Sequence, residues 1–295
     1  MTDTKLYLGP LTDNRRWGLV NIRPDDVIVV TPPKCGTTWM QTIVALLFFG
    51  DPELETELSV KMPWIDIRVR EMAEVADRLE AMTHRRSMKS HTPMDGVPLD
   101  DEAQYICVFR HPLDAHFSYR KHMRNLPMPW FDLWYPEDDP EGITFRRFLD
   151  GGAEGFDTDA MPLAHILRHY QAAMAVADRP NVTLFHYADM TRDLPATFAK
   201  VAELLGISHP DQVMDQLIQA ATFENMKTHA ERFAPSGGKG FFKSDTEFFH
   251  SGSSGKWHGV LSDAEYAAYD AIMDAHLEPD DRAWLEYGSG GTVPA

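Results

Sequence analysis

Val27-Ile-Val-Val-Thr-Pro-Pro-Lys34-Cys-Gly-Thr-Thr38-Trp39 is the stretch of sequence that decides the fold, and it runs on into an apolar segment that ends at Gly50. Four β-branched apolar residues before the prolines predict a buried strand. Apolar residues at helical spacing from Thr38 onward, followed by a glycine stop, predict a helix. The stretch is therefore expected to form a strand, a tight turn and a helix.

The turn carries groups that bind a phosphate. It offers Gly36 for close backbone approach, the free N–H groups of the helix start, the ammonium of Lys34 and the hydroxyls of Thr37 and Thr38. In the nucleoside-triphosphate loop G-x-x-x-x-G-K-[ST] the lysine follows the glycine, whereas here it precedes it. A phosphate loop of another kind is therefore predicted. The alternative is a turn that needs its glycine and prolines for geometry alone.

The composition limits the class of protein. With 295 residues and 43% apolar content, the chain is expected to form a single α/β domain over residues 1–295. A net charge of −17 opposes nucleic acid or an anionic membrane as the main partner. No signal peptide is visible, and the longest apolar run, residues 43–49, is too short to cross a bilayer, so a cytoplasmic protein without integral membrane association is expected. Cys35 and Cys107 need no disulfide, as in a reducing compartment.

Two further segments aim charged side chains at one edge of the predicted sheet. A short strand-like piece ends at Pro93 and places Lys89 and His91 two residues apart, hence on one side of an extended backbone. The buried strand predicted over residues 104–109 delivers Arg110 at its carboxyl end, where open α/β sheets bind ligands. A magnesium-dependent triphosphatase usually has an aspartate there. A guanidinium instead favours a multiply anionic ligand held by cations without a metal.

The rest of the regular pattern completes an α/β domain. A third strand is predicted over residues 182–187. Helices are predicted over residues 67–82, 162–177, 193–205 and 213–220, and from Ser262 onward.

Two segments lack such a pattern. Residues 126–160 mix prolines and glycines with Trp130, Phe131, Trp134 and Tyr135, and are expected to form either a lid over an apolar acceptor pocket or a small satellite core. Residues 235–259 are rich in glycine and serine and cannot form a core, so they are a disordered connection or a flap that orders on a ligand. Their five aromatic residues favour the flap.

Six motifs, in the same order along nearly the whole chain, together resemble the cytosolic-type sulfotransferase family. They are Pro33-Lys34-Cys35-Gly36-Thr37-Thr38-Trp39, Lys89-Ser90-His91, Arg110 with Ser118 eight positions later, His186-Tyr187, Thr222-Phe223 and Gly252-Ser-Ser-Gly255-Lys-Trp257. The resemblance implies an α/β fold with a central parallel β-sheet flanked by helices. It also implies transfer of a sulfuryl group from 3′-phosphoadenosine 5′-phosphosulfate (PAPS) to a hydroxyl or amine of a small-molecule acceptor, which leaves adenosine 3′,5′-bisphosphate (PAP).

The same resemblance implies a role for each matched residue. The phosphosulfate would be held by the loop residues Lys34, Cys35, Gly36, Thr37, Thr38 and Trp39. The 3′-phosphate would be held by Arg110 and Ser118, and Gly252 aligns with the glycine of the family's flap motif. The adenine would be surrounded by Trp39, Tyr187, Thr222 and Phe223. His91 would be the general base.

The expected chemistry requires no metal. A sulfuryl group in transfer spreads negative charge over its oxygens and the leaving phosphate, which fixed cations at Lys34 and Lys89 and helix-end N–H groups stabilise. A neutral imidazole with a pKa near 6.5 suits His91 for taking the acceptor proton near neutral pH. The aromatic lid indicates an apolar alcohol, a phenol or a lipid-linked hydroxyl as acceptor.

Three departures from the family pattern matter. Cys35 stands where the family usually has serine, and a thiol at a helix N-terminus is expected to be acidified and oxidisable. In the flap, His250-Ser251 replaces the usual Arg-Lys, so two cations for the 3′-phosphate are missing. The residues that can compensate are Arg110, Lys239, Lys243 and Lys256. The dimerisation motif of many animal members is absent from residues 258–265, so the oligomeric state is not indicated.

Other functions stay open on the residues alone. A cysteine-dependent phosphatase with Cys35 as nucleophile wants an arginine six residues later, where Gln41 stands. A P-loop nucleotide kinase needs magnesium ligands that the second strand does not offer. The third alternative is a non-catalytic adenine-nucleotide-binding protein, which the two missing flap cations would favour. A purely structural interpretation also stays open for two residues. Arg110 would then form an ion pair with Asp114, and His91 would be a packing residue.

Overall fold

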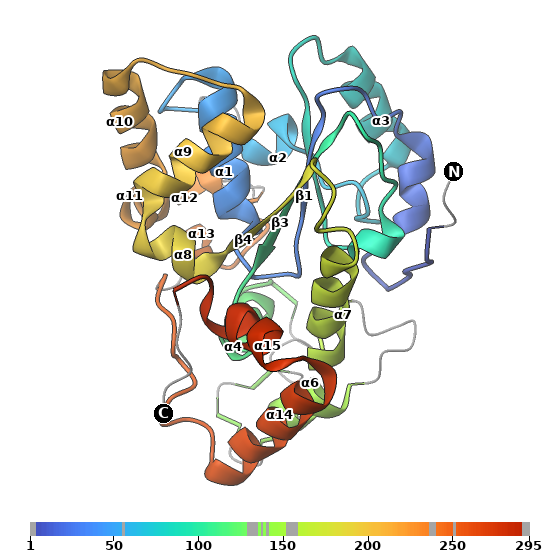
Figure 1. Cartoon of the computed structure of the whole chain (residues 1–295), viewed down its shortest axis with the longest axis vertical. Helices are drawn as coiled ribbons and strands as arrows, with labels where there is room; N and C mark the ends of the chain where they lie inside the picture. The colour runs from blue at the N-terminus through green and yellow to red at the C-terminus, as the bar shows by residue number, and fades with distance from the viewer. Residues whose placement is uncertain are drawn as a thin grey trace.

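Four parallel strands form the sheet at the centre of the molecule (Figure 1). The computed structural model describes residues 4–54, 57–128, 135–136, 138–139, 142–151, 159–235, 240–249 and 252–290. The strands are β1 (Val27–Val30), β2 (Ser87–Ser90), β3 (Gln104–Phe109) and β4 (Val182–His186), in spatial order β2-β1-β3-β4. In register, Val27 lies opposite Ser87 and Gln104. Because every pair is parallel, the carboxyl ends of the strands share one edge of the sheet, here called the carboxyl edge.

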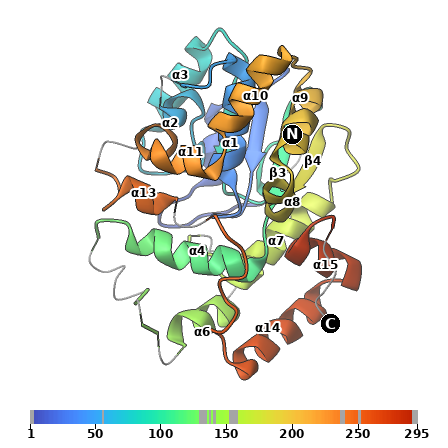
Figure 2. The same ribbon diagram turned by 90° about the vertical axis from the view of Figure 1, so that its left-hand side faces the viewer.

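Helices flank the sheet on both sides (Figures 1 and 2), which confirms the predicted α/β fold with a parallel sheet. One side carries α1 (Thr37–Phe49), α9 (Leu194–Leu205) and α10 (Asp211–Ala220), and the other carries α3 (Met72–Ala81), α7 (Leu163–Met174), η1 (Asn14–Leu19) and η2 (Met94–Gly96). Beyond the carboxyl edge lie α4 (Pro112–Arg124), α6 (Ile143–Asp150), α14 (Asp263–His276) and α15 (Pro279–Tyr287). The short helices are α2 (Leu58–Lys61), α8 (Tyr187–Arg192), α11 (Phe223–Thr228), α12 (Ala230–Phe233) and α13 (Asp245–Phe248). No helix among these described segments has the length and apolarity needed to cross a bilayer.

The stretch that decides the fold forms β1 and α1. All four residues of β1 are buried, because a parallel sheet is covered on both faces. Gly36 precedes α1 with a φ of 109°, and Gly50 ends it with a φ of 61°. Both values lie in the left-handed region that favours glycine, so a glycine determines where this helix begins and where it ends.

The helix predicted over residues 67–82 is wrong in its first part. It begins only at Met72, as α3. Ile67 instead forms a β-bridge with Thr12, and Trp64 forms one with Lys89 of β2. These pairings join residues far apart in the sequence and hold the segment before α3 extended, which a local apolar pattern cannot indicate.

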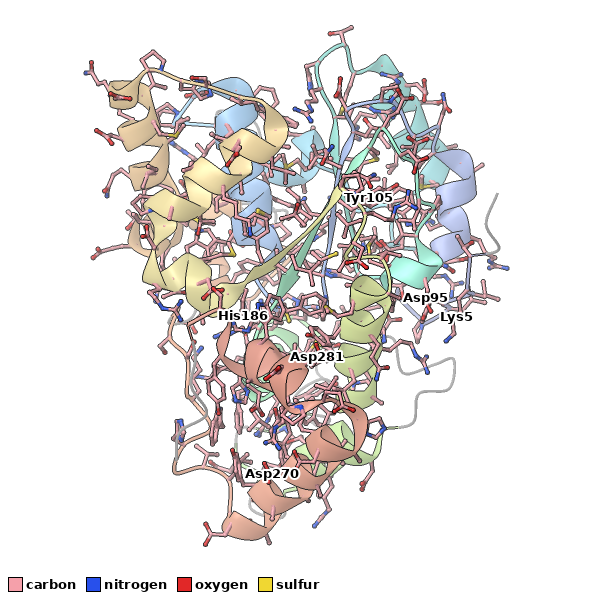
Figure 3. The ribbon with its side chains drawn as sticks, in the orientation of Figure 1. Lys5, Asp95, Tyr105, His186, Asp270 and Asp281 are labelled. Carbon is pink, nitrogen blue, oxygen red and sulfur yellow. The ribbon has the colours of Figure 1, made fainter. Side chains whose placement is uncertain are left out.

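Neither α6 nor α15 was predicted. The first, α6, lies inside residues 126–160 and buries Phe145 and Phe148. The second, α15, follows the last predicted helix and docks against α7 and β4. Tyr170 donates to Asp281 at 2.8 Å, and the ring Nε2 of His186 lies 3.0 Å from the Leu285 carbonyl (Figure 3). Its docking closes the molecule beyond the carboxyl end of β4.

A buried ion pair joins the amino ends of β1 and β2. Arg86 Nε donates to Asp26 Oδ1 at 2.8 Å, and both side chains are at most 2% exposed. The Arg86 carbonyl also accepts the N–H of Val27, the first residue of β1. Because an unpaired buried charge is costly, this pair holds the register that brings the end of β2 beside the end of β1.

Candidate functional site

The loop between β1 and α1 takes its shape from two left-handed residues. Lys34 has a φ of 66° and Gly36 a φ of 109°. A Cβ on Gly36 would lie 3.1 Å from Tyr187 Cδ2, so glycine lets the loop approach that ring. Thr37 shares a 2.5 Å hydrogen bond with Thr31, which follows β1. The loop thus places a lysine beside the positive dipole end of α1, where anions bind.

Arg110 follows β3 at the same edge of the sheet. Its guanidinium carbon lies 4.2 Å from the centroid of the Tyr187 ring. One terminal nitrogen donates to the Ser253 carbonyl at 2.9 Å, and the other lies 3.5 Å from the Lys34 carbonyl. Its Nε is buried without a hydrogen-bonding partner in the described part of the chain. A buried charged donor that lacks a partner is costly, and a bound anion would satisfy it.

Asp114, the alternative ion-pair partner of Arg110, binds the backbone of the segment over residues 235–259, which is called the flap below for its position only. Its two carboxylate oxygens accept the N–H groups of Gly255 and Lys256 at 3.1 and 3.2 Å. The carboxylate therefore anchors the carboxyl end of the flap and holds Lys256 on the Arg110 side of the site.

Four segments bring together the residues implied for adenine binding. The indole of Trp39 donates to the Ala221 carbonyl at 2.8 Å and meets the Tyr187 ring edge to face at 5.3 Å. Tyr187 donates to the Gly252 carbonyl at 3.3 Å. A Cβ on Gly252 would lie 2.8 Å from the Phe223 ring, so this glycine permits close packing of the flap on α11.

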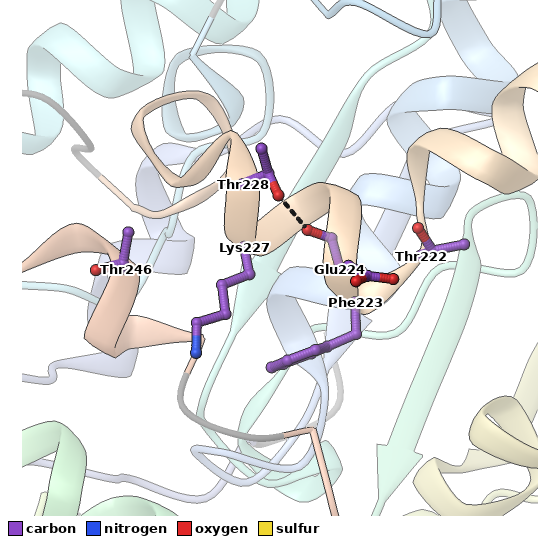
Figure 4. Close-up of a pocket in the computed structure, with 6 residues that line it drawn as sticks. All are labelled: Thr222, Phe223, Glu224, Lys227, Thr228 and Thr246. Atoms are coloured by element: carbon purple, nitrogen blue, oxygen red, sulfur yellow. Dashed lines mark hydrogen bonds between the residues drawn. The ribbon is translucent and has the colours of Figure 1, made fainter.

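An open hollow of about 770 Å³ lies beside this aromatic group. It is lined by Thr222, Phe223, Glu224, Lys227, Thr228 and Thr246. Figure 4 shows Phe223 and Lys227 pointing from α11 toward the same space. The Thr222 hydroxyl is engaged in capping α11 through the N–H of Asn225 at 3.3 Å, so it shapes the helix start behind the hollow.

Ser118 shares a face of α4 with Asp114, the residue that binds the backbone of Gly255 and Lys256. Ser118 is half-buried and stands four residues after Asp114 and four before His122, so these three side chains share one helix face. This spacing is compatible with the role implied for Ser118 beside Arg110.

His91 and Lys89 come together against one indole. The His91 ring meets Trp64 edge to face at 4.7 Å, and Lys89 Nζ lies 4.7 Å from the centroid of the same ring. His91 Nδ1 lies 2.8 Å from the Thr31 carbonyl. Because a carbonyl can only accept, Nδ1 carries the proton and Nε2 keeps the lone pair. Asp66 accepts the backbone N–H of His91 at 3.0 Å and fixes this residue in place.

The cations at the carboxyl edge are held in low-dielectric surroundings. Burial, followed by the charges of Arg110 and Lys89, lowers the pKa of Lys34 to about 7. Burial lowers the pKa of Lys89 to about 8, although Asp66 opposes the shift. Burial and then Arg110 lower the pKa of Lys256 to about 8. These ammonium groups repel one another in the free protein, and a bound polyanion would relieve that repulsion.

Two expectations about titration are wrong. Burial, reinforced by the charge of Lys89, lowers the pKa of His91 to about 3 instead of leaving it near 6.5. Burial also raises the pKa of Cys35 to about 12, against the opposing charge of Arg110. The thiol is fully buried and protonated, so it is neither acidified nor a nucleophile.

The described part of the flap packs on the body of the molecule. Its aromatic residues Phe242, Phe249 and Trp257 are buried. The ammonium nitrogen Nζ of Lys34 lies over the ring of Phe248, 4.2 Å from its centroid. The flap residues Lys239, His250 and Ser251 and the lid residues Trp130, Phe131 and Trp134 lie outside the described residues.

Trp64 and Asp66 contact the site but were not predicted from the sequence. They belong to the extended segment before α3, which pairs with β2 through Trp64 and Lys89. The signal that could have found them was the run Trp64-Ile-Asp66, too short to read as a strand. Among the described residues, no group of three or more histidine, cysteine, aspartate or glutamate side chains could hold a metal ion.

Comparison with known proteins places this geometry in one family. The sulfotransferase domain model matches residues 24–280. The chain is 35% identical to a glycolipid sulfotransferase of Mycobacterium bovis (strain BCG / Pasteur 1173P2), with 100% of this chain and 98% of the relative covered. It is 34% identical, with the same coverage, to a glycolipid sulfotransferase of Mycobacterium tuberculosis (strain ATCC 25618 / H37Rv). The crystal structure of mouse sulfotransferase SULT7A1 complexed with PAP superposes with a TM-score of 0.70 at 17% identity, covering 93% of this chain and 94% of that one.

Proposed function

Because the chain belongs to the sulfotransferase family and is a sulfotransferase, we propose that it moves a sulfuryl group from PAPS to a hydroxyl of a lipid-linked acceptor. One observation carries the proposal: Lys34 of the loop after β1, Lys89 and His91 at the end of β2, and Arg110 after β3 come from three separate segments and meet at the carboxyl edge. The identity over the full length to glycolipid sulfotransferases supports a lipid-linked hydroxyl over a small phenol.

The donor-binding part of the proposal rests on unpaired positive charge. Lys34 and the N–H groups at the start of α1 would hold the 5′-phosphosulfate. Arg110, whose Nε lacks a partner among the described residues, would hold the 3′-phosphate together with Ser118. Burial lowers the pKa of Lys256 first, and the nearby charge of Arg110 lowers it further, so we assign to Lys256 the charge that the family's flap motif would supply. Cys35, Thr37, Thr38 and Gly252 would contribute through the backbone or through hydroxyls.

The adenine would lie against the aromatic group at the flap. Trp39 and Tyr187 form one wall, and Phe223 with Thr222 forms the wall that continues into the hollow of Figure 4. The described flap contacts reach both walls through Gly252. We therefore propose that residues 235–259 form a flap over the nucleotide and that residues 126–160 form a lid over the acceptor, within one domain.

His91 is proposed as the general base. Its Nδ1–H is committed to the Thr31 carbonyl, so Nε2 would take the proton of the acceptor hydroxyl. The acceptor oxygen then forms a bond to sulfur, the bond from sulfur to the bridging phosphate oxygen breaks, and PAP leaves with the electron pair of that bond. Lys34 and Lys89 would stabilise the charge that develops on the transferred oxygens and the leaving phosphate. Negative charge of the bound donor would raise the low pKa of His91 toward the range where an imidazole is an effective base.

A nucleotide-binding measurement separates this proposal from its rivals. PAP is expected to raise the melting temperature much more than ATP with magnesium does, because binding to the native state alone stabilises it in proportion to affinity. Arg110→Ala should weaken PAP binding by about 1.5 to 3 kcal/mol, the value of a charged hydrogen bond, while adenosine 5′-phosphate loses much less. A magnesium-dependent preference for ATP would instead favour a nucleotide kinase. Equal losses for the two adenosine nucleotides would remove Arg110 from the 3′-phosphate.

A further inference from the structure

A second histidine faces the proposed reaction site from α4. His122 stands one turn beyond Ser118 on the helix face that also carries Asp114. Its ring centroid lies 5.5 Å from that of Phe242 and 5.7 Å from that of Phe248. The same Phe248 ring lies 4.2 Å from Lys34 Nζ, so the histidine and the loop lysine contact one flap residue.

The electrostatic surroundings of His122 are those of the reacting groups. After burial, the charges of Lys34, Lys89 and His91 are what hold the pKa of His122 well below its usual range. The ring is therefore neutral and within electrostatic reach of both catalytic lysines and of the proposed base. None of these three neighbours is on α4, so His122 lies beside groups that other segments bring to the carboxyl edge.

The ring nitrogen Nδ1 of His122 is buried and has no hydrogen-bonding partner among the described residues. A buried polar atom without a partner is destabilising, and a bound hydroxyl would satisfy it. His116 on the same helix also has an unpartnered nitrogen, but it stacks on Phe148 at 4.3 Å, and the charges that act on it are Arg120 and Asp139. That histidine is a core residue, whereas His122 is partly exposed beside the reacting groups.

We propose that His122 binds the acceptor: Nδ1 exchanges a hydrogen bond with a second hydroxyl of the acceptor, next to the hydroxyl that His91 deprotonates. The acceptor class is then a polyhydroxylated headgroup, such as a sugar on an apolar tail, and not an alcohol with a single hydroxyl. Phe242 and Phe248 offer an apolar surface for the C–H face of such a ring. The inference rests on the proposed function and names the substrate class of that same site.

A site built to hydrogen-bond a substrate hydroxyl discriminates against the analogue that lacks it, because its own polar atom is then left unpaired. For one neutral hydrogen bond the expected preference in kcat/KM is about tenfold. The preference should follow the nitrogen, not the bulk of the ring. Replacement by phenylalanine keeps the volume and removes the polar atom, and replacement by asparagine keeps a polar group near the position of Nδ1.

The test compares n-octyl β-D-glucopyranoside with its monodeoxy analogues as acceptors, with PAPS as donor. Wild-type protein should transfer to the full glucoside with a kcat/KM about tenfold above that for at least one monodeoxy analogue. In His122→Phe this ratio should fall to about one while the rate with that analogue is kept, and in His122→Asn part of the ratio should return. His116→Phe is the matched control on the same helix and should keep the wild-type ratio.

The outcomes separate the two proposals. Transfer by the wild type with no preference among the glucosides, an unchanged ratio in a folded His122→Phe, or a ratio of about one in a folded His122→Asn would overturn the role of His122 and leave the sulfotransfer proposal standing. Wild-type protein that binds PAP but transfers to none of the acceptors, including 1-octanol and a glycolipid, would overturn the proposed function and this inference with it. Melting temperature with and without PAP verifies that each variant folds and binds the donor.

Discussion

At the scale of single residues, two lysines that were expected to be permanently charged have pKa values close to neutral pH. Lys34 and Lys89 were expected to be fixed cations, but burial brings their pKa values to about 7 and about 8. Their positive charge is therefore incomplete near neutral pH until an anion arrives. The low pKa follows from packing and from neighbouring cations of other segments, so the residue type in the sequence could not indicate it.

This pKa lowering predicts proton uptake on binding PAP. A bound polyanion favours the charged ammonium and raises both pKa values, so protons should be taken up at pH 8 and hardly any at pH 6, where the lysines are already charged. Calorimetric titrations in Tris and in HEPES should give different apparent enthalpies at pH 8. Lys34→Arg should reduce the difference, because a guanidinium stays charged. Identical enthalpies in the two buffers at pH 8 would contradict the lysine assignment.

At the scale of elements, the sequence pattern predicted the helices and strands whose structure depends on residues close together in the chain. β1, the loop, β3 and α9 were predicted correctly because their apolar period, their glycines and their caps lie within the segment itself. The start of α3, the placement of Trp64 beside His91 and the docking of α15 were missed, because each depends on contacts with residues far away in the sequence. The role proposed for His122 was not predicted either, although its spacing from Ser118 is visible in the sequence.

The flap gives the prediction at this scale. Its described residues contact the proposed nucleotide site, Ser253 through Arg110 and Phe248 through Lys34, so a bound nucleotide should hold it in place. Limited trypsin digestion should cut after the lysines of residues 235–259 in the free protein, and PAP should suppress the cleavage. Adenosine, which lacks the phosphates, is the control and should protect much less. Cleavage that saturating PAP leaves unchanged would make the segment a linker.

At the scale of the whole molecule, buried histidines predict acid sensitivity. Burial lowers the pKa of His91, His111, His116 and His165 to about 3 and that of His186 to about 4. Between pH 6.5 and these values the unfolded chain binds protons that the folded chain refuses, so the free energy of unfolding rises with pH and falls on acidification. The full contribution is present above pH 6.5, and each group removes up to about 1.4 kcal/mol per pH unit below it.

Melting curves between pH 7 and 4.5 measure this effect. The melting temperature should fall steadily below pH 6.5, and His116→Phe should make the fall shallower by removing one group that must stay neutral. Burial raises the pKa values of Asp66 and Glu286, which works in the opposite direction, but among the described residues these are two carboxyl groups against the five histidines named above. A melting temperature that stays constant down to pH 5 would contradict the buried, neutral state of these histidines.

The proposed function places one reaction at the carboxyl edge, and the role proposed for His91 as the base tests it most directly. The measurement is the single-turnover rate of sulfuryl transfer from labelled PAPS to a glycolipid acceptor, for the wild type and for His91→Ala, with the PAP dissociation constant measured beside it. Wild-type protein should transfer the label, and His91→Ala should slow transfer by roughly a hundredfold or more while PAP affinity is nearly unchanged. A folded His91→Ala protein that transfers within about a few-fold of the wild-type rate, or one that loses melting temperature and PAP affinity together while turnover per folded molecule is kept, would contradict that role.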